Sequence, residues 1–383
     1  MAKPLVVDAD GHVLEPPDLW QRYLEPKFRD RAMCIKLLDN GDEYLEVDGK
    51  MHFFGPGAMG GNGGAFHDPK ELIYGRKKYW ETAQSTPGGI DPDARVRQMD
   101  EEGIDIALLY PTIGLCWEGE CPDPELSAAY CRAYNNYLFD FCSKHSDRLI
   151  PVAHVALRDV NLAVAEVERV KGRAKGIFIT PYPANGYPQG DRYYDPFWAA
   201  CEAANLPVAS HVQTRRFTPG AELHRSGTPP SVMQSWFDSG VWFMFMQLPM
   251  DSLLGLNCVF QGGVLDRFPN LRYVVLETGC GWLPGWLERA DGKYELFSFM
   301  TEMKHKPSET FRRNCWISTE VDEAAIPFVA GIVGANRMVW ASDYPHLDAH
   351  RDPVKELREK IAPLSPQDQE WILGKAAVEL YRL

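Results

Sequence analysis

The chain has 383 residues, 45% of them hydrophobic, and its formal net charge at pH 7 is −13. This length is large for one ordinary domain but fits an α/β barrel of about 250 residues that carries insertions. The negative charge excludes nucleic acid and anionic membranes as expected partners, because both require clustered lysine and arginine. No apolar run reaches the ~18 residues of a membrane span. A soluble enzyme for a small-molecule substrate is therefore expected.

The cysteines and the N-terminal residues indicate the cellular compartment in which the protein is expected. The nine cysteines are odd in number and form no Cys-x-x-Cys pair, which is typical of reduced thiols in a cytosolic protein. The N-terminal MAKPLVV lacks the long apolar run of a signal peptide. The sequence therefore predicts a cytoplasmic protein.

The first ordered stretch is VVDADGHVLE, residues 6–15. Its apolar start predicts a short buried strand, and Asp10 and His12 follow two residues apart. In an extended chain such residues point to the same face. One carboxylate and one imidazole are thus expected to point together at a metal beyond the end of this strand.

Residues from about 27 to 85 interrupt the regular pattern as a small insertion. The alternation in CIKLLDNGDEYLEVDGKMHFF predicts short antiparallel strands with turns at Asp39–Gly41 and Asp48–Gly49. The glycine-rich run GPGAMGGNGG, residues 55–64, lacks the Gly-Lys-Ser/Thr of a phosphate loop. It is interpreted as a flexible connector, with a lid over the pocket as the alternative.

From Asp91 onward, helices alternate with short apolar strands. The helix in DPDARVRQMDEE is expected to begin at Pro92 and to end at Gly103. Eight Val/Ile/Leu-rich strands are predicted, near residues 5, 105, 150, 177, 208, 274, 316 and 339. Eight such units predict one α/β domain over residues 1–383, a (β/α)8 TIM-like barrel. A doubly wound open sheet is the alternative, but no Gly-x-Gly-x-x-Gly follows any strand.

Polar residues follow most of these strands, at the end where barrel enzymes carry their active sites. They are Asp10, His12, His154, His211, Glu277, Glu320, Asp343 and His346. Burying these side chains together without partners would cost free energy. A divalent cation would offset the repulsion between the carboxylates. A single histidine after a strand can instead be a hydrogen-bonded structural residue, and Glu320 can brace a strand. The predicted metal ligands are Asp10, His12, His154, His211, Glu277 and Asp343.

At these residues the chain resembles the amidohydrolase superfamily, in the amidohydrolase-related branch that contains aminocarboxymuconate semialdehyde decarboxylase. The resemblance covers nearly the whole chain, from Val6 to Leu383. It rests on the motifs VDADGHVLEP, DPDARVRQMDEEGID, LPVASH, VLDRFPNLRYVVLETG and WASDYPH. By position, it implies that the metal is approached by Asp10, His12, His211 and Asp343.

The chain departs from the family pattern at two ligand positions. Asp10 replaces the first histidine of the usual His-x-His, and Glu277 stands where the sixth strand usually carries a histidine. The fourth strand, GIFIT, ends without a lysine, so a carbamylated lysine that bridges two metals is not expected. The extra carboxylates make Mn or Fe as plausible as Zn, with one or two ions per chain.

The leading functional hypothesis is a metal-dependent hydrolase or decarboxylase for a small carboxylate or amide. The expected catalytic residues are Asp343 for proton transfer and His211 or His346 for stabilising negative charge. Several further side chains are candidates for substrate contacts. Arg215 and Arg216 could clamp a carboxylate, His224 is a weaker candidate, and the pocket walls could include Trp117, Tyr182 and Trp282.

Two other functions remain open at this point. The carboxylate-rich site could hold two redox metals, Fe or Fe/Mn, and activate O₂, as the resemblance to this branch allows. Alternatively, the chain could be a non-catalytic partner subunit, with the aromatic segment Trp236–Phe245 as its docking face and ordinary helix packing as the competing interpretation. A homo-oligomer is expected, or a hetero-oligomer with a homologous chain.

Overall fold

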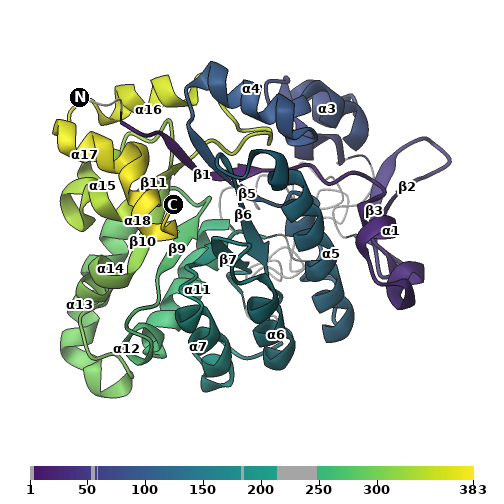
Figure 1. Ribbon diagram of the computed structural model, residues 1–383. Coiled ribbons are helices and arrows are strands. Elements are labelled where there is room, and N and C mark those ends of the chain that lie inside the picture. The colour runs from purple at the N-terminus through teal and green to yellow at the C-terminus, as the bar shows by residue number, and fades with distance from the viewer. Residues whose placement is uncertain (1–3, 53–56, 58, 183–184, 214–247) are drawn as a thin grey trace, which may run out of the picture.

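A computed structural model describes residues 4–52, 57, 59–182, 185–213 and 248–383. Its main element is an eight-stranded parallel sheet with the strand order of the sequence (Figure 1). The strands are β1 (Val7–His12), β5 (Ile106–Tyr110), β6 (Leu149–His154), β7 (Gly176–Ile179), β8 (Val208–His211), β9 (Tyr273–Leu276), β10 (Cys315–Glu320) and β11 (Met338–Ala341). The sheet curls into a nearly closed barrel, so the predicted TIM-like fold is confirmed and the open-sheet alternative is excluded.

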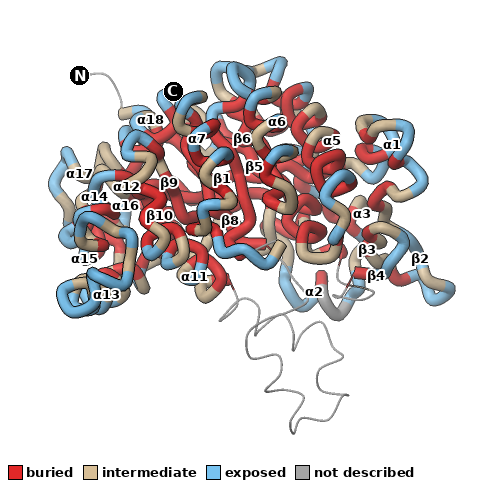
Figure 2. Tube along the Cα trace, turned by 90° about the horizontal axis from the view of Figure 1, so that it is seen from below, coloured by how far each residue is buried: buried red, intermediate tan, exposed pale blue. Residues whose placement is uncertain are grey.

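Helices cover the outside of the barrel, while the strands are buried at its centre (Figure 2). Those in the first half of the chain are α1 (Leu19–Tyr23), α2 (Pro69–Tyr74), α3 (Tyr79–Ser85), α4 (Pro92–Glu102), α5 (Pro124–Cys142), α6 (Val160–Val170) and α7 (Asp195–Ala203). Those in the second half are α11 (Leu248–Gln261), α12 (Val264–Arg267), α13 (Leu283–Phe297), α14 (Pro307–Asn314), α15 (Ile326–Val333), α16 (Pro353–Ile361), α17 (Pro366–Glu370) and α18 (Ala376–Tyr381). Among the described residues, no helix has both the length and the apolar character needed to cross a membrane.

Local sequence signals set the ends of helix α4. The Asp91 side chain accepts a hydrogen bond from the Ala94 backbone N–H at 2.7 Å, and Pro92 occupies the first helical position. Gly103 ends the helix in the left-handed conformation, with φ of 77°. The predicted bounds of this helix are therefore confirmed.

The range 27–85 contains a small antiparallel sheet of β2 (Cys34–Leu37), β3 (Glu43–Val47) and β4 (Lys50–Met51). It is followed by a short 3-10 helix, Met59–Gly63, and by α2 and α3. The alternation in the sequence thus predicted the strands but not the helices. Residues 53–56 and 58 of the glycine-rich run lie outside the described residues.

Hydrogen bonds at the C-terminal end of β1 join it to the segment after β11. The Asp343 N–H donates to the Asp10 carbonyl at 3.1 Å, and the His12 N–H donates to the Tyr344 carbonyl at 2.8 Å. The Asp8 carboxylate accepts hydrogen bonds from the Ser342 backbone N–H at 3.0 Å and from its hydroxyl at 2.6 Å. The barrel is therefore joined at a seam that contains predicted metal ligands on both sides.

A buried arginine of α4 holds the two sides of this seam together. Arg95, 2% exposed, donates to the carbonyls of His12 at 2.9 Å and Tyr344 at 3.3 Å. Its guanidinium also lies 3.9 Å from the Asp8 carboxylate. A Cβ atom at Gly11, between the two predicted ligands of β1, would collide with this guanidinium and with the Asp8 carboxylate, so glycine leaves room for both.

We predict that Arg95→Met lowers the free energy of unfolding by about 3 kcal/mol, because it leaves the buried Asp8 charge without its partner. Urea denaturation followed by circular dichroism measures the change. Arg97→Met is the matched control, since Arg97 is exposed on the same helix, and it should change stability by less than about 0.5 kcal/mol. Equal stability of the two variants would contradict the role of Arg95.

Candidate metal centre

Six side chains meet at the C-terminal ends of four barrel strands. Two groups of possible metal ligands occur among the described residues, and they share His12 and Glu277. One group is Asp10, His12, His211 and Glu277, and the other is His12, Glu277, Asp343 and His346. Within each group the ligand atoms all lie within 4.8 Å of one another, close enough to surround one ion.

Two of the three imidazoles, those of His12 and His211, face several carboxylates of this cluster. His211 Nε2 lies 3.1 Å from Glu277 Oε2 and 3.3 Å from Asp10 Oδ1. His12 Nε2 lies 3.2 Å from Asp343 Oδ1, 3.6 Å from Asp10 Oδ1 and 3.9 Å from Glu277 Oε2. The same carboxylates therefore face both rings.

Most of these atoms are buried and have no hydrogen-bond partner among the described residues. They are both carboxylate oxygens of Asp10, Nε2 of His12, Nε2 of His211, Oε2 of Glu277 and Oδ2 of Asp343. Unpaired buried polar atoms are costly and rare in folded proteins. Imidazole nitrogens and carboxylate oxygens together are a donor set that suits Zn²⁺, Mn²⁺ or Fe²⁺. The residues present therefore fit a divalent metal ion.

The other ring nitrogens of both histidines are fixed by backbone carbonyls. His12 Nδ1 lies 2.7 Å from the Pro111 carbonyl oxygen, and His211 Nδ1 lies 2.8 Å from that of Val212. Because a carbonyl oxygen only accepts, each Nδ1 must carry the proton and donate it. In the neutral ring, Nε2 then presents its lone pair to the cluster, as metal-binding histidines require.

Electrostatics also favours a cation here. Burial raises the pKa of Asp10, and burial followed by the charges of Asp348 and Glu277 holds the pKa of Asp343 well above its usual range. Burial lowers the pKa of His211, but the charges of Asp10 and Glu277 outweigh that effect and raise it well above normal. Each ionised carboxylate thus destabilises its neighbours, and a divalent cation would offset the repulsion.

Backbone strain marks two of the carboxylates. Glu277 and Asp343 have φ angles of 51° and 52°, in the left-handed region that non-glycine residues seldom adopt. Such a conformation costs of the order of 1 kcal/mol and concentrates at functional sites. The Ser318 hydroxyl accepts a hydrogen bond from the Glu277 backbone N–H at 3.0 Å and so holds one of these turns.

His346 connects the cluster to the end of β5. Its Nδ1 lies 2.7 Å from Asp343 Oδ1, and its Nε2 lies 3.0 Å from the Thr112 hydroxyl. Thr112 is held in turn by Glu15, whose carboxylate accepts backbone N–H bonds from residues 112–114 at 2.8 to 3.3 Å. A hydrogen-bonded chain therefore runs from Thr112 through His346 to Asp343.

The structure places His154 outside both ligand groups. Its Nε2 lies 3.2 Å from Glu118 Oε2 and 3.3 Å from Gln213 Nε2, and all three side chains are buried. The Phe178 ring packs against both His154 and His211, with centroid distances of 4.4 and 5.5 Å. The geometry thus gives His154 a buried carboxylate partner in place of the predicted metal.

The remaining candidates are dispersed. The Trp117 ring packs against His154 with centroids 5.3 Å apart, and the Tyr182 hydroxyl donates to Gln213 at 3.4 Å. Trp282 packs against Trp286 beside α13, and Glu320 ends β10 without joining either ligand group. The described residues do not include Arg215, Arg216, His224 or Trp236–Phe245.

A sequence model of the amidohydrolase family matches residues 7–383. The chain belongs to the amidohydrolase family. Among its curated relatives, γ-resorcylate decarboxylase of Rhizobium sp. (strain MTP-10005) is 24% identical over 278 residues, which cover 70% of this chain and 80% of the relative. The 2-amino-3-carboxymuconate-6-semialdehyde decarboxylase of Dictyostelium discoideum is 24% identical over 298 residues, covering 76% and 77%. The predicted family branch is confirmed, and so is the prediction of an enzyme.

Solved structures agree with this assignment. An amidohydrolase from Mycobacterium avium subsp. paratuberculosis K-10 matches with a TM-score of 0.81 and 25% identity, over 100% of both chains. A dihydroxybenzoic acid decarboxylase from Polaromonas sp. JS666, solved with manganese and 2-nitroresorcinol, matches with a TM-score of 0.68 and 17% identity, over 100% of this chain and 98% of that one. At that lower identity the likeness concerns the fold alone.

Sequence reasoning missed the residues that orient the cluster. Thr112 lies two residues after the second barrel strand and Gln213 two residues after the fifth, so the position that singled out the ligands could have identified both. Glu118 and Arg95 carry no comparable signal, because their partners lie 36 and 83 or more positions away.

We predict that His12→Ala and His211→Ala each reduce bound metal at least tenfold, since even residues that only orient metal ligands typically contribute 10- to 100-fold in affinity. Inductively coupled plasma mass spectrometry of the dialysed protein gives the metal content. His350→Ala is the control, because His350 pairs with Glu356 outside the cluster. Metal retained in both cluster variants would refute the proposed ligands.

Proposed function

We propose that this amidohydrolase is a metal-dependent decarboxylase that acts on a small aromatic or conjugated carboxylate. The observation that carries the proposal is the set of buried, unpartnered ligand atoms at the end of the barrel, in a chain whose curated relatives are decarboxylases. Hydrolysis of a small carboxylate or amide substrate, the other reaction expected from the sequence, is less favoured because those relatives are decarboxylases.

A divalent ion held by Asp10, His12, His211, Glu277 and Asp343 would polarise a substrate oxygen and fix the carboxylate for cleavage. Related structures support a divalent metal, since the Polaromonas decarboxylase was solved with manganese. Three carboxylates among the five ligands favour Mn²⁺ or Fe²⁺ over Zn²⁺ as the resident ion.

Asp343 is the proton carrier in this proposal. Decarboxylation requires that a proton reach the carbon that bears the carboxylate; the bond to that carboxylate then breaks, its electron pair returns to the ring, and CO₂ leaves. Asp343 Oδ1 lies 2.7 Å from His346 Nδ1 and 3.2 Å from His12 Nε2, while Oδ2 is buried and has no hydrogen-bond partner among the described residues. His346 and Thr112 keep this carboxyl oriented and can return a proton to it after each turnover.

The Thr112–His346–Asp343 chain gives a test that separates proton transfer from metal binding. We predict that His346→Gln lowers kcat about a hundredfold, within the range expected for loss of general acid–base assistance, and that Thr112→Val lowers it about tenfold. Both variants should keep their metal. The compounds tested are 2,6-dihydroxybenzoate and related hydroxybenzoates, and a coupled assay measures the CO₂ that is released.

Thr310→Val is the control for removal of a buried threonine hydroxyl, since Thr310 lies in α14 away from the cluster. It should leave kcat within about twofold. Full turnover by His346→Gln with normal metal content would remove the chain from the mechanism. Absence of CO₂ release by the metal-loaded wild type from every carboxylate in the panel would count against decarboxylation itself.

A second function has one specific observation in its favour. The two ligand groups overlap at His12 and Glu277, and a carboxylate shared by two groups could bridge two redox ions that activate O₂. Metal analysis combined with an oxygen-uptake assay separates the two functions. Two iron or iron and manganese ions per chain with substrate-dependent oxygen uptake would favour the oxygenase; one ion and no uptake would favour the decarboxylase.

A further inference from the structure

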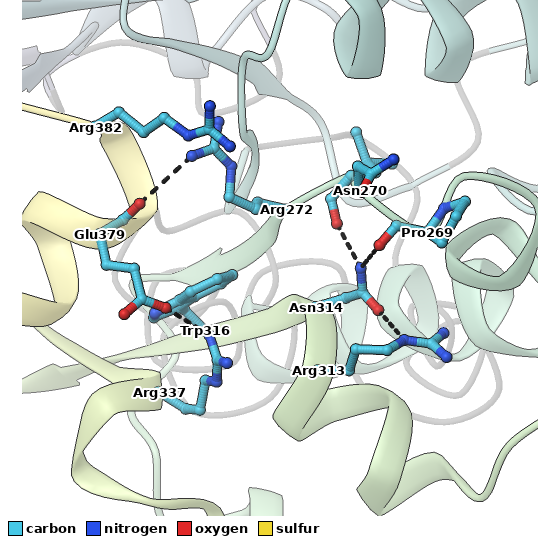
Figure 3. Close-up of a pocket in the computed structure, with 10 residues that line it drawn as sticks. Pro269, Asn270, Arg272, Arg313, Asn314, Trp316, Arg337, Glu379 and Arg382 are labelled. Carbon is cyan, nitrogen blue, oxygen red and sulfur yellow. Dashed lines mark hydrogen bonds and ion pairs between the residues drawn. The ribbon is translucent and has the colours of Figure 1, made fainter.

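A pocket of about 280 Å³, shown in Figure 3, lies at the N-terminal ends of barrel strands, whereas the metal-ligand cluster lies at the C-terminal ends. Its walls come from the N-terminal ends of β9, β10 and β11, from the end of α14 and from the C-terminal helix α18. The residues that matter for its chemistry are Arg272, Arg313, Trp316, Arg337, Glu379 and Arg382. We call this the floor pocket.

The floor pocket is strongly basic in an acidic protein. Four arginines and one glutamate line it, a formal excess of three positive charges, whereas the whole chain carries −13. Like charges gathered around one cavity repel one another unless a counter-charge lies between them. The composition of the pocket therefore calls for an anion.

Two of the arginines have carboxylate partners inside the protein. Arg313 lies 2.9 Å from Asp266, and Arg337 lies 3.2 Å from Glu379. The Arg337 guanidinium also stacks over the Trp316 ring, 4.4 Å from its centroid. These two side chains are thus held in place as the wall of the pocket.

The other two arginines pair with no carboxylate among the described residues. Arg272 donates to neutral oxygens, the carbonyl and side chain of Asn205 at 2.5 and 3.0 Å and the Glu379 carbonyl at 3.4 Å. Burial and then the nearby positive charge of Arg382 lower the pKa of Arg272 to about 10. Figure 3 shows the two guanidiniums next to each other. This pair therefore carries charge that the described part of the chain leaves uncompensated.

The lining of the pocket also includes an indole donor that has no partner among the described residues. The Trp316 indole N–H is buried, and in the part of the chain that the structure describes it has no hydrogen-bond partner. An indole nitrogen and a guanidinium both donate hydrogen bonds and accept none. A ligand with several acceptor oxygens and a negative charge would match all of these groups.

We propose that the floor pocket binds a phosphate group, either as inorganic phosphate or as the phosphoryl end of a small metabolite. A phosphate offers negative charge and oxygens in the geometry that arginine pairs with in two-pronged fashion. The volume is just below the roughly 300 Å³ at which sites for drug-sized ligands begin, so the bound group is small. A phosphate here would link Arg382, beyond α18, to Arg272 at the start of β9.

The test is isothermal titration calorimetry of the metal-loaded protein with inorganic phosphate and, separately, with glycerol 3-phosphate, at constant ionic strength. One phosphate per chain is expected to bind. Arg382→Gln should weaken this binding about ten- to a hundredfold, because a hydrogen bond between charged groups is removed. Tighter binding of the ester than of inorganic phosphate identifies a metabolite as the ligand; equal or weaker binding identifies inorganic phosphate.

Two controls locate the site. Arg289→Gln removes an exposed arginine of α13 outside the pocket and should leave phosphate affinity unchanged. His211→Ala disrupts the metal cluster, so retained binding in that variant shows that phosphate does not bind at the metal. Arg382 is exposed and pairs with no carboxylate in the part of the chain that the structure describes, so its loss should not impair folding. No saturable binding up to 20 mM, or binding unchanged in Arg382→Gln, would overturn the proposal.

Discussion

The barrel seam between β1 and the segment after β11 is the constraint on which the structure depends. The backbone hydrogen bonds that close it join Asp10 and His12 on one side to Asp343 and Tyr344 on the other, and three of these four residues are predicted metal ligands. The contacts that close the barrel therefore also bring the predicted ligands together. Ligands more than 300 positions apart acquire fixed relative positions from the main chain, and only their rotamers remain to be set.

This arrangement explains why strain is tolerated at Glu277 and Asp343. Both adopt left-handed backbone conformations that an isolated turn would avoid, but neighbouring bonds hold each one: the Ser318 hydroxyl for Glu277, and the Asp10 carbonyl for Asp343. The turns direct their carboxylates into the barrel mouth, where burial raises the pKa of both and the charge of Glu277 raises the pKa of Asp343 further. A bound cation would offset this repulsion, which favours binding of the ion.

The sequence predicted those features that follow from local pattern. The apolar runs predicted all eight barrel strands. The polar residues just after them, such as His211 and Asp343, predicted the cluster, because parallel strands of a barrel end at one rim. The same rule included His154, which instead faces Glu118, since position after a strand does not reveal which partner a side chain meets. The role of Arg95 could not be predicted for a related reason. It depends on contacts with Asp8, His12 and Tyr344 that exist only once the barrel closes.

The distribution of charge gives the two ends of the barrel different chemistry. Carboxylates gather at the C-terminal ends of the strands, and arginines gather at the N-terminal ends of β9 to β11. Each cluster gathers like charges, and the two lie at opposite ends of the strands, where no ion pair joins them among the described residues. Each end must therefore find its own counter-ion. A cation at the mouth and an anion at the floor satisfy that requirement separately, so binding at one end is expected to leave affinity at the other nearly unchanged.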